Sequence, residues 1–387
     1  MSGNNSRREK GMGAVYQRDE NLWEGRLKIG LKPNGSPKYK YFSGKTESVV
    51  KKKIRDYLKD ENREENTKKV SVETYTNNWL KLYKVPSLKR SSYDRLENTA
   101  KYQVFPYIGS IQLNQLTSDD VQEMLTKLQK NGASYSVVKK AYDCINAVVK
   151  HALAVGDLDR NVMLPVQKPS SVQFEQREIR YFTKKEAAQI IEESARTYST
   201  GALVYIYGDA YVLALSTGLR EGELAALKKT DYNAEENTLH VQRTIVSVKK
   251  RNENGESSGY ELVENPTKTY SGDRTIHLNK RATEAIQRMV ARYPDSEYIV
   301  CNSKGKPIPP ANMTRTLHRM LDHLGIERAG MHALRHTFAT TLFANGVDVK
   351  TVSEILGHAN VQITMNIYIH VIDEIKKKAV ETLDDIF

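Results

Sequence analysis

The chain has 387 residues, a length typical of two or three domains. Its 59 Lys and Arg against 47 Asp and Glu give a net charge of +12, which predicts an acidic partner, with nucleic acid first. No run of about 18 apolar residues occurs, so a membrane-spanning helix is excluded. The two cysteines, Cys144 and Cys301, are too few for a disulfide framework or a Cys-based zinc site and are typical of a reducing cytoplasm.

The positive charge is concentrated near the N-terminus. Residues 1–69 hold 18 Lys and Arg against 10 Asp and Glu, a net of +8. Residues 70–175 carry a net of +3, and residues 176–387 a net of +1. Runs of this kind are often solvated tails, but the strand-like, aromatic-rich sequence here favours a folded basic module.

Residues 1–65 are predicted to form this module from three strands and one helix. The first strand starts at Ala14, the second covers residues 22–29 with period-two alternation, and the third covers residues 38–42. A helix is predicted over residues 47–62. The candidates for DNA contact in this module are Arg26, Lys38, Tyr39 and Lys40.

A charged stretch over residues 62–69 is typical of a linker, and residues 66–168 then have an almost wholly helical pattern. Four helices are predicted, capped at Ser71, at Ser91 or Ser92, at Thr117 and at Ser134, and ending near Tyr83, Val104, Asn131 and Val155. The second is expected to stop before Pro106. We therefore predict a compact helical bundle. Its candidate DNA-facing charges are Lys89, Arg90, Lys139 and Lys140; the alternative is that they are solvated helix faces.

Residues 176–387 mix helices with short strands, with helices dominant. Strands are predicted over residues 239–248, 274–278 and 298–300. The predicted helices cover residues 183–196, 205–215, 279–293, 311–324, 332–343 and 349–356. The fold class expected for the whole chain is multidomain, mainly α with α+β parts.

Five short patterns in the last domain carry side chains that can do chemistry. They are Thr217-Gly-Leu-Arg220-Glu-Gly-Glu223, Pro266-Thr-Lys268 before a turn and Arg274, His332-Ala-Leu-Arg335-His336, Leu356-Gly357-His358 and Thr364-Met-Asn-Ile-Tyr368. Each alone is weak, because a helical Arg beside acids is usually a surface ion pair and a lone Tyr usually packs in a core. Together they supply a tyrosine nucleophile, two guanidiniums that can clamp a phosphate, a lysine acid and histidines. These groups suffice to cleave a phosphodiester without a metal.

With these motifs in this order, residues 177–372 resemble the catalytic domain of the tyrosine recombinases, also called the lambda-integrase family. Residues 70–165 resemble the family's SAM-like core-binding bundle. Residues 12–60 resemble the arm-binding domain of integrases from Gram-positive conjugative transposons and related phages, on Gly13-Ala-Val-Tyr, Trp23, Gly35 and a helix started by Thr46. The resemblance implies a catalytic set of Arg220, Lys268, His332, Arg335, His358 and Tyr368, with Glu223 in support.

The resemblance also implies a mechanism. Tyr368 would attack the scissile phosphate to form a 3′-phosphotyrosyl link, while Arg220 and Arg335 hold that phosphate. Lys268 would protonate the departing 5′ oxygen, and His332 would act as general base. No metal or other cofactor is expected, because the arginines supply the positive charge that a metal would bring.

The two remaining members of the set have supporting roles in the same picture. His358 would donate a hydrogen bond to the phosphate. Glu223 would orient Arg220 or the neighbouring helix.

The expected partners are double-stranded DNA at core and arm sites, three further copies of the chain in a tetramer, and an excision factor. Residues 373–387 form an amphipathic tail, which we expect to dock on a neighbouring protomer rather than on its own domain. The chain is expected to act in the bacterial cytoplasm, on the nucleoid. The alternatives are a chromosome-resolution or inversion recombinase, a type IB topoisomerase or a non-catalytic DNA-binding regulator.

Overall fold

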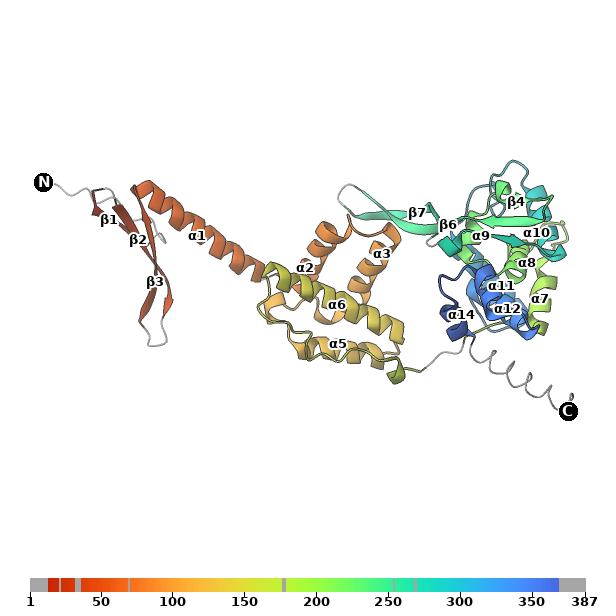
Figure 1. Ribbon diagram of the computed structural model, residues 1–387, viewed down its shortest axis with the longest axis horizontal. Helices are drawn as coiled ribbons and strands as arrows, with labels where there is room; N and C mark the ends of the chain where they lie inside the picture. The colour runs from red at the N-terminus through yellow and green to blue at the C-terminus, as the bar shows by residue number, and fades with distance from the viewer. Residues whose placement is uncertain are drawn as a thin grey trace. The chain divides into compact units, whose positions relative to one another are not determined.

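In a computed structural model, the chain is described over residues 13–20, 22–31, 36–68, 70–175, 179–252, 255–267 and 270–368 (Figure 1). The contacts divide it into two compact units. The first comprises Met1–Leu88 with Arg95–Glu175, and the second comprises Lys89–Asp94 with Gln176–Phe387. Among the described residues, no helix is both long and apolar enough to cross a membrane.

The N-terminal part of the first unit is a three-stranded antiparallel sheet and one helix. Its elements are β1 (Ala14–Asp19), β2 (Leu22–Leu31), β3 (Pro37–Gly44) and α1 (Glu47–Lys68). A small core of Leu27, Val50 and Ile54 joins β2 to α1. At Gly25 a Cβ would lie 2.7 Å from side-chain atoms of both Val50 and Ile54, so the glycine lets the helix approach the sheet closely. One face of the sheet is therefore covered by α1.

The helical part of the first unit follows. Its elements are α2 (Val72–Trp79), η1 (Leu80–Lys84), α3 (Arg90–Thr99), η2 (Ala100–Val104), α4 (Phe105–Ile108), η3 (Leu113–Gln115), α5 (Ser118–Lys130) and α6 (Tyr135–Val155). The first residues of α3, up to Asp94, belong to the second unit by their contacts. Ser71 and Thr117 cap α2 and α5 as predicted, each accepting a hydrogen bond from the backbone of the first turn. The Tyr75 hydroxyl donates to Asp157 (2.8 Å), which ties α2 to the residues after α6.

The second unit is a mixed α/β domain. Its helices are α7 (Lys184–Ser194), α8 (Gly208–Thr217), α9 (Glu221–Ala226), α10 (Lys280–Arg292), α11 (Pro310–Leu324), α12 (Met331–Ala344), α13 (Val349–Leu356) and α14 (Val361–Ile367). It also contains the short 3-10 helices η5 (Lys229–Asp231) and η6 (Tyr270–Gly272), and a third, η4 (Ser171–Gln173), ends the first unit. Strands β4 (Tyr232–Asn233), β5 (Thr238–Val241) and β8 (Arg274–His277) form one antiparallel sheet, and β6 (Arg243–Arg251) pairs with β7 (Ser257–Pro266). The mostly α architecture with α+β parts confirms the predicted fold class.

Helix α8 is the buried centre of this unit. Eight of its ten residues are buried, and it contacts α7, α10 and α12. A helix with so little exposed surface has neighbours packed around most of its circumference, and its buried carboxylate Asp209 pairs with Arg288 and Arg292. The chain leaves α8 at Gly218 and enters α9 at Arg220, so the first predicted arginine is attached directly to the core of the domain.

Of two predicted helix boundaries, one differs from the structure and one agrees with it. The linker expected over residues 62–69 is wrong, because α1 continues to Lys68. Its Glu, Arg, Asn and Lys residues include no Gly or Pro, and most of them favour a helix. The expected end near Val104 is confirmed, because η2 ends there; Pro106 then lies in the first turn of α4, where a missing N–H costs no hydrogen bond.

The strand predictions need correction in the second unit. The single strand expected over residues 239–248 is two strands, β5 and β6, which leave Gln242 between them and join different partners. The predicted strand over residues 298–300 is only an isolated bridge between Lys228 and Tyr298. Strand β7 had no prediction, because its Ser, Gly and Glu content lacks clear alternation.

Candidate active site

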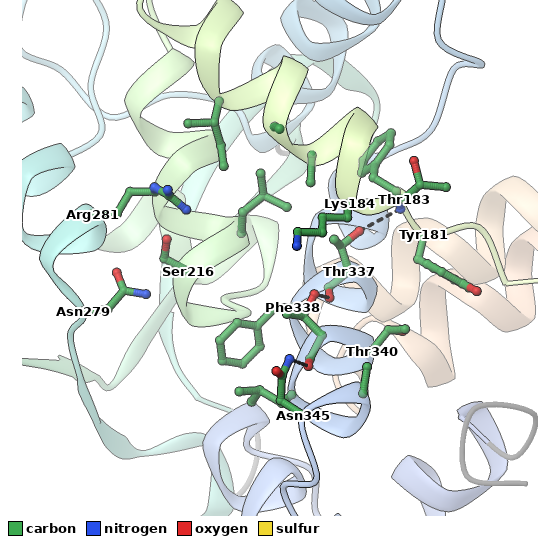
Figure 2. Close-up of a pocket in the computed structure, with 18 of the residues that line it drawn as sticks. Tyr181, Thr183, Lys184, Ser216, Asn279, Arg281, Thr337, Phe338, Thr340 and Asn345 are labelled. Carbon is green, nitrogen blue, oxygen red and sulfur yellow. Dashed lines mark hydrogen bonds between the residues drawn. The ribbon is translucent and has the colours of Figure 1, made fainter. Parts of the chain in front are cut away.

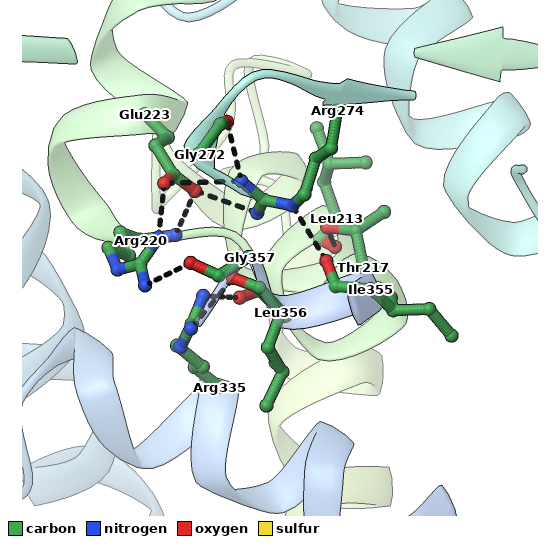
Figure 3. A network of polar contacts seen from close by, with 11 residues as sticks. Leu213, Thr217, Arg220, Glu223, Gly272, Arg274, Arg335, Ile355, Leu356 and Gly357 are labelled. Carbon is green, nitrogen blue, oxygen red and sulfur yellow. Dashed lines mark hydrogen bonds and ion pairs between the residues drawn. The ribbon is translucent and has the colours of Figure 1, made fainter. Parts of the chain in front are cut away.

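Glu223 lies at the centre of a cluster of guanidinium groups (Figure 3). Its Oε1 accepts a hydrogen bond from Arg220 Nη1 (2.7 Å), and its Oε2 accepts from the Arg220 backbone N–H (3.0 Å) and from Arg274 Nη2 (3.0 Å). Arg220 is the residue before the first turn of α9 and Glu223 is its third residue, so the carboxylate also caps the helix. Local helix capping thus fixes the orientation of the first predicted catalytic arginine.

Backbone carbonyls at the end of α13 bind Arg220 and Arg274 and also a third arginine, Arg335. Three successive carbonyls, at residues 355–357, accept hydrogen bonds from Arg274 Nε (2.7 Å), Arg335 Nη2 (2.8 Å) and Arg220 Nη2 (3.0 Å), in that order. Arg335 Nη1 also donates to the carbonyl of Gly218 (2.8 Å), at the end of α8. Carbonyls at helix C-termini carry partial negative charge, so two helix ends and one carboxylate stabilise three cations.

Gly357 allows α13 to end this close to the cluster. Its backbone has a φ of +67°, and a Cβ there would lie 2.6 Å from the carbonyl oxygen of Ser271 and 2.9 Å from Arg274 Nη1. Only glycine adopts this conformation readily and also leaves room for the guanidinium.

The charges in the cluster perturb one another. Burial by itself raises the pKa of Glu223, but the positive charges and hydrogen bonds of Arg274 and Arg220 outweigh it and lower that pKa to about 2. Burial and the charge of Arg220 lower the pKa of Arg335, whose guanidinium nevertheless stays protonated at neutral pH. Among the described residues, Glu223 is the one carboxylate hydrogen-bonded to Arg220 and Arg274, so the cluster keeps positive charge that favours an anion.

Tyr368 is buried at the end of α14, with 3% of its surface exposed. Its hydroxyl lies 2.8 Å from His336 Nδ1, and its ring packs against His336 (centroids 5.7 Å apart) and Phe343 (5.2 Å). Burial raises the pKa of Tyr368 to about 12, against a smaller lowering by the charge of Arg335. The predicted nucleophile is therefore a neutral phenol whose hydroxyl lies within hydrogen-bond distance of a histidine.

Both predicted histidines are close enough to Arg335 for its charge to lower their pKa values. His358 follows α13, and its Nδ1 is 2.6 Å from Thr364 Oγ1; burial and then Arg335 lower the pKa of His358 to about 4. His332 begins α12 with an exposed side chain, and desolvation and then Arg335 lower its pKa. Among the described residues His332 has no hydrogen-bond partner, and the Tyr368 hydroxyl lies within hydrogen-bond distance of His336; the general-base role expected for His332 stays a prediction.

The predicted catalytic residues are thus gathered in one place, with one exception. Arg220, Glu223, Arg335 and His358 surround the end of α13, and Tyr368 follows α14, which contacts α13. Lys268 lies outside the described residues, so its role stays a prediction. In the described part of the chain, no group of His, Cys, Asp and Glu is placed to hold a metal ion.

Sequence reasoning missed two residues of this site. Arg274 shares Glu223 with Arg220 and is 7% exposed in its side chain. His336 holds the Tyr368 hydroxyl. Both residues belong to the motifs given above. Their positions in the sequence, one beside a turn and one within a helix, do not indicate which distant side chain each of them contacts.

The DNA-binding candidates of the N-terminal sheet divide between its two faces. Arg26 lies on the open face, 4.5 Å from the centroid of the Tyr39 ring. Lys40 lies on the opposite face, with Nζ 4.0 Å from the ring centroid of Tyr57 on α1, and alternation along β3 puts Lys38 on that same side.

The open face carries more than the two predicted residues. Lys28 is directly opposite Tyr39, and Tyr41 is opposite Arg26 and 62% exposed. Tyr16 on β1 is also exposed. The open face is defined here as Tyr16, Arg26, Lys28, Tyr39 and Tyr41, a mixture of cations and aromatic rings.

The candidates of the helical part are already engaged in part. Lys139 pairs with Asp143 one turn later on α6, while Lys140 is exposed. Lys89 and Arg90 belong to the second unit by their contacts; Lys89 is exposed, and Arg90 donates to the carbonyl of Lys249 (3.0 Å). Lys139 and Arg90 are thus bound within the chain, whereas Lys140 and Lys89 are the more accessible pair.

A groove of about 780 Å³ lies between α7 and α12, beside the end of α8 (Figure 2). Its lining is mainly apolar, with Ala188 and Ile191 from α7, Leu215 from α8 and Phe338 from α12. Lys184 and Arg281 are the two basic side chains among its lining residues. We refer to it as the α7–α12 groove.

Comparison with known families agrees with the location of this site. The family model described as "Phage integrase family" matches residues 180–374, and that described as "Phage integrase, N-terminal SAM-like domain" matches residues 71–129. The chain is 30% identical over 384 residues to a protein named "Tyrosine recombinase XerC-like" from Caldanaerobacter subterraneus subsp. tengcongensis, which covers 93% of this chain and 95% of that protein.

Two solved structures share the fold. The Tn1549 transposon integrase in complex with transposon right end DNA has a TM-score of 0.63 and 20% identity, covering 80% of this chain and 100% of that chain. The lambda integrase tetramer bound to a Holliday junction has a TM-score of 0.57 and 16% identity, covering 92% of this chain and 97% of that chain. The SAM-like domain and the catalytic fold expected from the sequence are thereby confirmed.

Proposed function

Because the chain belongs to the phage integrase family of tyrosine recombinases, we propose that it integrates and excises a mobile DNA element through a 3′-phosphotyrosyl intermediate. The observation that carries this proposal is a cluster of three guanidiniums, held by one carboxylate and two helix ends, in the same domain as a buried tyrosine. The cations attract a phosphate, and the tyrosine can replace one of its ester bonds.

Arg220 and Arg335 bind the scissile phosphate. Arg220 is 35% exposed in its side chain and reaches the surface, while Arg335 is 4% exposed and fixed by two carbonyls. Preorganised cations of this kind stabilise the charge that develops at phosphorus in the transition state. Arg274 and Glu223 act behind them as positioning residues.

The tyrosine and the remaining groups perform the exchange. Tyr368 attacks phosphorus, the 5′ oxygen leaves with a proton from Lys268, and His358 and His332 donate hydrogen bonds to the phosphate oxygens. Because one phosphodiester replaces another, the bond energy is retained and no nucleotide hydrolysis is needed. No metal or other cofactor has a step in this scheme.

Three parts of the chain share the work: residues 1–65 bind arm DNA, residues 66–168 bind core DNA and residues 176–387 hold the chemistry. The open face of the N-terminal sheet supplies Arg26, Lys28 and exposed aromatic rings, which suits a DNA groove. Lys140 and Lys89, both within residues 66–168, are exposed candidates for phosphate contacts by the core-binding part. Because the substrate is chromosomal DNA, the proposed place of action is the bacterial cytoplasm.

The active assembly is a homotetramer on two duplexes, and the α7–α12 groove accepts the tail of a neighbouring copy. Residues 373–387 carry apolar residues at helical spacing and five acidic against three basic side chains, while Lys184 and Arg281 contribute positive charge to the groove lining. The tail itself lies outside the described residues. An excision factor sets the direction of recombination on this DNA-bound assembly.

The groove proposal is tested with Ala188→Arg, which places a long side chain at an exposed groove position, and with deletion of residues 373–387. Both changes should reduce tetramers on DNA by an order of magnitude in analytical ultracentrifugation. Lys185→Arg, on the same helix outside the lining, is the matched control. Normal assembly by both variants would refute the groove as the docking site.

The catalytic proposal is tested with a nicked suicide duplex whose sequence is that of the junction between the host DNA and the mobile element that carries this gene. The nick traps the covalent intermediate. Wild type should form a covalent protein–DNA adduct and Tyr368→Phe should form none. An adduct that survives the substitution would refute the nucleophile, and absence of any adduct would favour a non-catalytic DNA-binding regulator. Cleavage restricted to the chromosome-dimer resolution site would favour the XerC-like alternative that the 30% identical relative suggests.

A further inference from the structure

Two histidines on α12, His332 and His336, are candidates for accepting the tyrosine proton. His332 and His336 are one helical turn apart, so both project from the same side of the helix. Arg335, which the proposed function places on the phosphate, stands directly before His336. The structure separates the two histidines by what they touch.

The Tyr368 hydroxyl is within hydrogen-bond distance of His336. The separation of Oη and Nδ1 is 2.8 Å, inside the range in which a general base can take a proton directly. The ring of Tyr368 stands edge-on to the imidazole at 63° and is fixed from another side by Phe343. His332 has an exposed side chain and no hydrogen-bond partner among the described residues.

We propose that His336, rather than His332, accepts the proton of the Tyr368 hydroxyl when that oxygen attacks the scissile phosphate. The inference rests on the proposed function, because it takes Tyr368 as the nucleophile. The O–H bond of Tyr368 breaks and an N–H bond forms at His336 Nδ1. At phosphorus the bond to Oη forms as the bond to the 5′ oxygen breaks, and the 5′ oxygen takes its proton from Lys268. On religation His336 returns the proton to the tyrosine.

The chemistry of both groups requires a proton acceptor at this position. Burial raises the pKa of Tyr368 to about 12, so a free phenolate is scarcely populated at neutral pH. The proton must therefore leave during the attack, toward the imidazole nitrogen that lies within hydrogen-bond distance of the hydroxyl. Imidazole Nδ1 accepts this bond only when His336 is neutral, with its own proton on Nε2.

The surroundings of His336 make it neutral before DNA binds. Burial, then His332 and then the positive charge of Arg335 lower its pKa to about 4. These groups, with Tyr368 from α14 and His358 after α13, are the titratable and charged groups that face it. A phosphate bound to Arg335 neutralises part of that positive charge and thereby makes the imidazole a stronger base. The base is thus activated by the substrate phosphate itself.

The test measures single-turnover cleavage of the nicked suicide duplex as a function of pH. His336→Gln keeps a hydrogen-bond acceptor for the phenol but cannot carry the proton. Its rate at pH 7 should fall about 100-fold or more, the usual contribution of general base catalysis, with DNA affinity unchanged. The wild-type rate should level off at high pH, whereas the His336→Gln rate should keep rising as the phenol ionises. His336→Ala should recover part of its rate with added imidazole.

His332→Gln is the matched control on the same helix face. Its rate should fall, but its pH profile should keep the wild-type shape. A wild-type rate in His336→Gln overturns the proposal, and a faster rate shows instead that His336 restrains the tyrosine. If His332→Gln, and not His336→Gln, shows the rate that keeps rising with pH, the proposal is also overturned. The proposed function fails separately, through an adduct in Tyr368→Phe, and a thermal melt of each variant checks that it is folded.

Discussion

On the open face of the N-terminal sheet, Arg26 is exposed and lies over the ring of Tyr39, whereas Arg335 in the second unit is 4% exposed and donates to two backbone carbonyls. The first cation can move to follow a DNA backbone. The second is fixed before any substrate arrives. The same side chain thus serves attraction in one region and preorganised charge stabilisation in the other.

The distribution of charge follows from this difference. Residues 1–69 carry a net of +8, while residues 176–387 carry only +1 and still hold the arginine cluster. Attraction depends on the number of exposed charges and weakens as salt rises. Catalytic stabilisation depends on a few cations at fixed positions, which net charge does not reveal.

The largest effect is expected from Arg335→Lys, which keeps the charge and removes the planar fork. An ammonium cannot hold the carbonyls of Gly218 and Leu356 and a phosphate in the same geometry. The rate of adduct formation should fall about 10³-fold, roughly 4 kcal/mol of transition-state stabilisation. Affinity for arm DNA, measured by fluorescence anisotropy, should not change; a parallel loss of both would contradict the separation of roles.

Glu223 should make the catalytic unit sensitive to acid. Its pKa is about 2 in the folded chain against 4.5 as the ordinary value, so the folded state binds the proton more weakly. The resulting stabilisation, roughly 3 kcal/mol, is complete above pH 4.5 and is lost as the pH falls toward 2. Urea unfolding of wild type and Glu223→Gln should show a smaller pH dependence over this range in the variant. Equal slopes would contradict the assigned pairing.

Much of this arrangement was predictable from local sequence. Thr217-Gly-Leu-Arg220 reads as a helix end followed by a new helix start, and Glu223 stands at the capping distance, so the pairing of Arg220 with Glu223 follows from three-residue spacing. The motif residues of α12 and α13 were likewise expected within helices at the observed positions.

The contacts between distant segments were not predictable. Arg274 joins Glu223 across 51 residues of sequence, and His336 meets Tyr368 across 32. Such contacts depend on how helices pack, and a helical pattern fixes only which residues share a face. In the N-terminal module the alternation separated Tyr39 from Lys40, but only packing shows which face α1 covers.

A moderate effect is expected from Arg26→Ala combined with Lys28→Ala on the open face. Each lost phosphate contact should reduce the slope of log affinity against log salt by about 1 and weaken arm DNA binding at all sequences alike. Titration of arm DNA at several salt concentrations measures both quantities. Adduct formation on a core-site duplex lacking arm sequences should remain at the wild-type rate, since the arginine cluster is untouched. An unchanged salt slope would show that the open face does not contact DNA.

The smallest effect is expected from Lys40→Met, the matched control for the open face. Lys40 Nζ lies over the Tyr57 ring on the side covered by α1, so its charge stabilises the packing of helix on sheet and does not face the DNA. A cation–π contact at such a site contributes about 0.5–1 kcal/mol, and methionine retains most of the apolar stem. Hydrogen exchange at the buried backbone amides of Leu27 and Ile54 should therefore speed up by a factor of about 2 to 5. Arm DNA affinity should stay within twofold of wild type. If Lys40→Met instead weakened arm binding as much as the open-face substitutions, DNA would have to contact the helix side of the sheet, and the division of the four N-terminal candidates by face would be wrong.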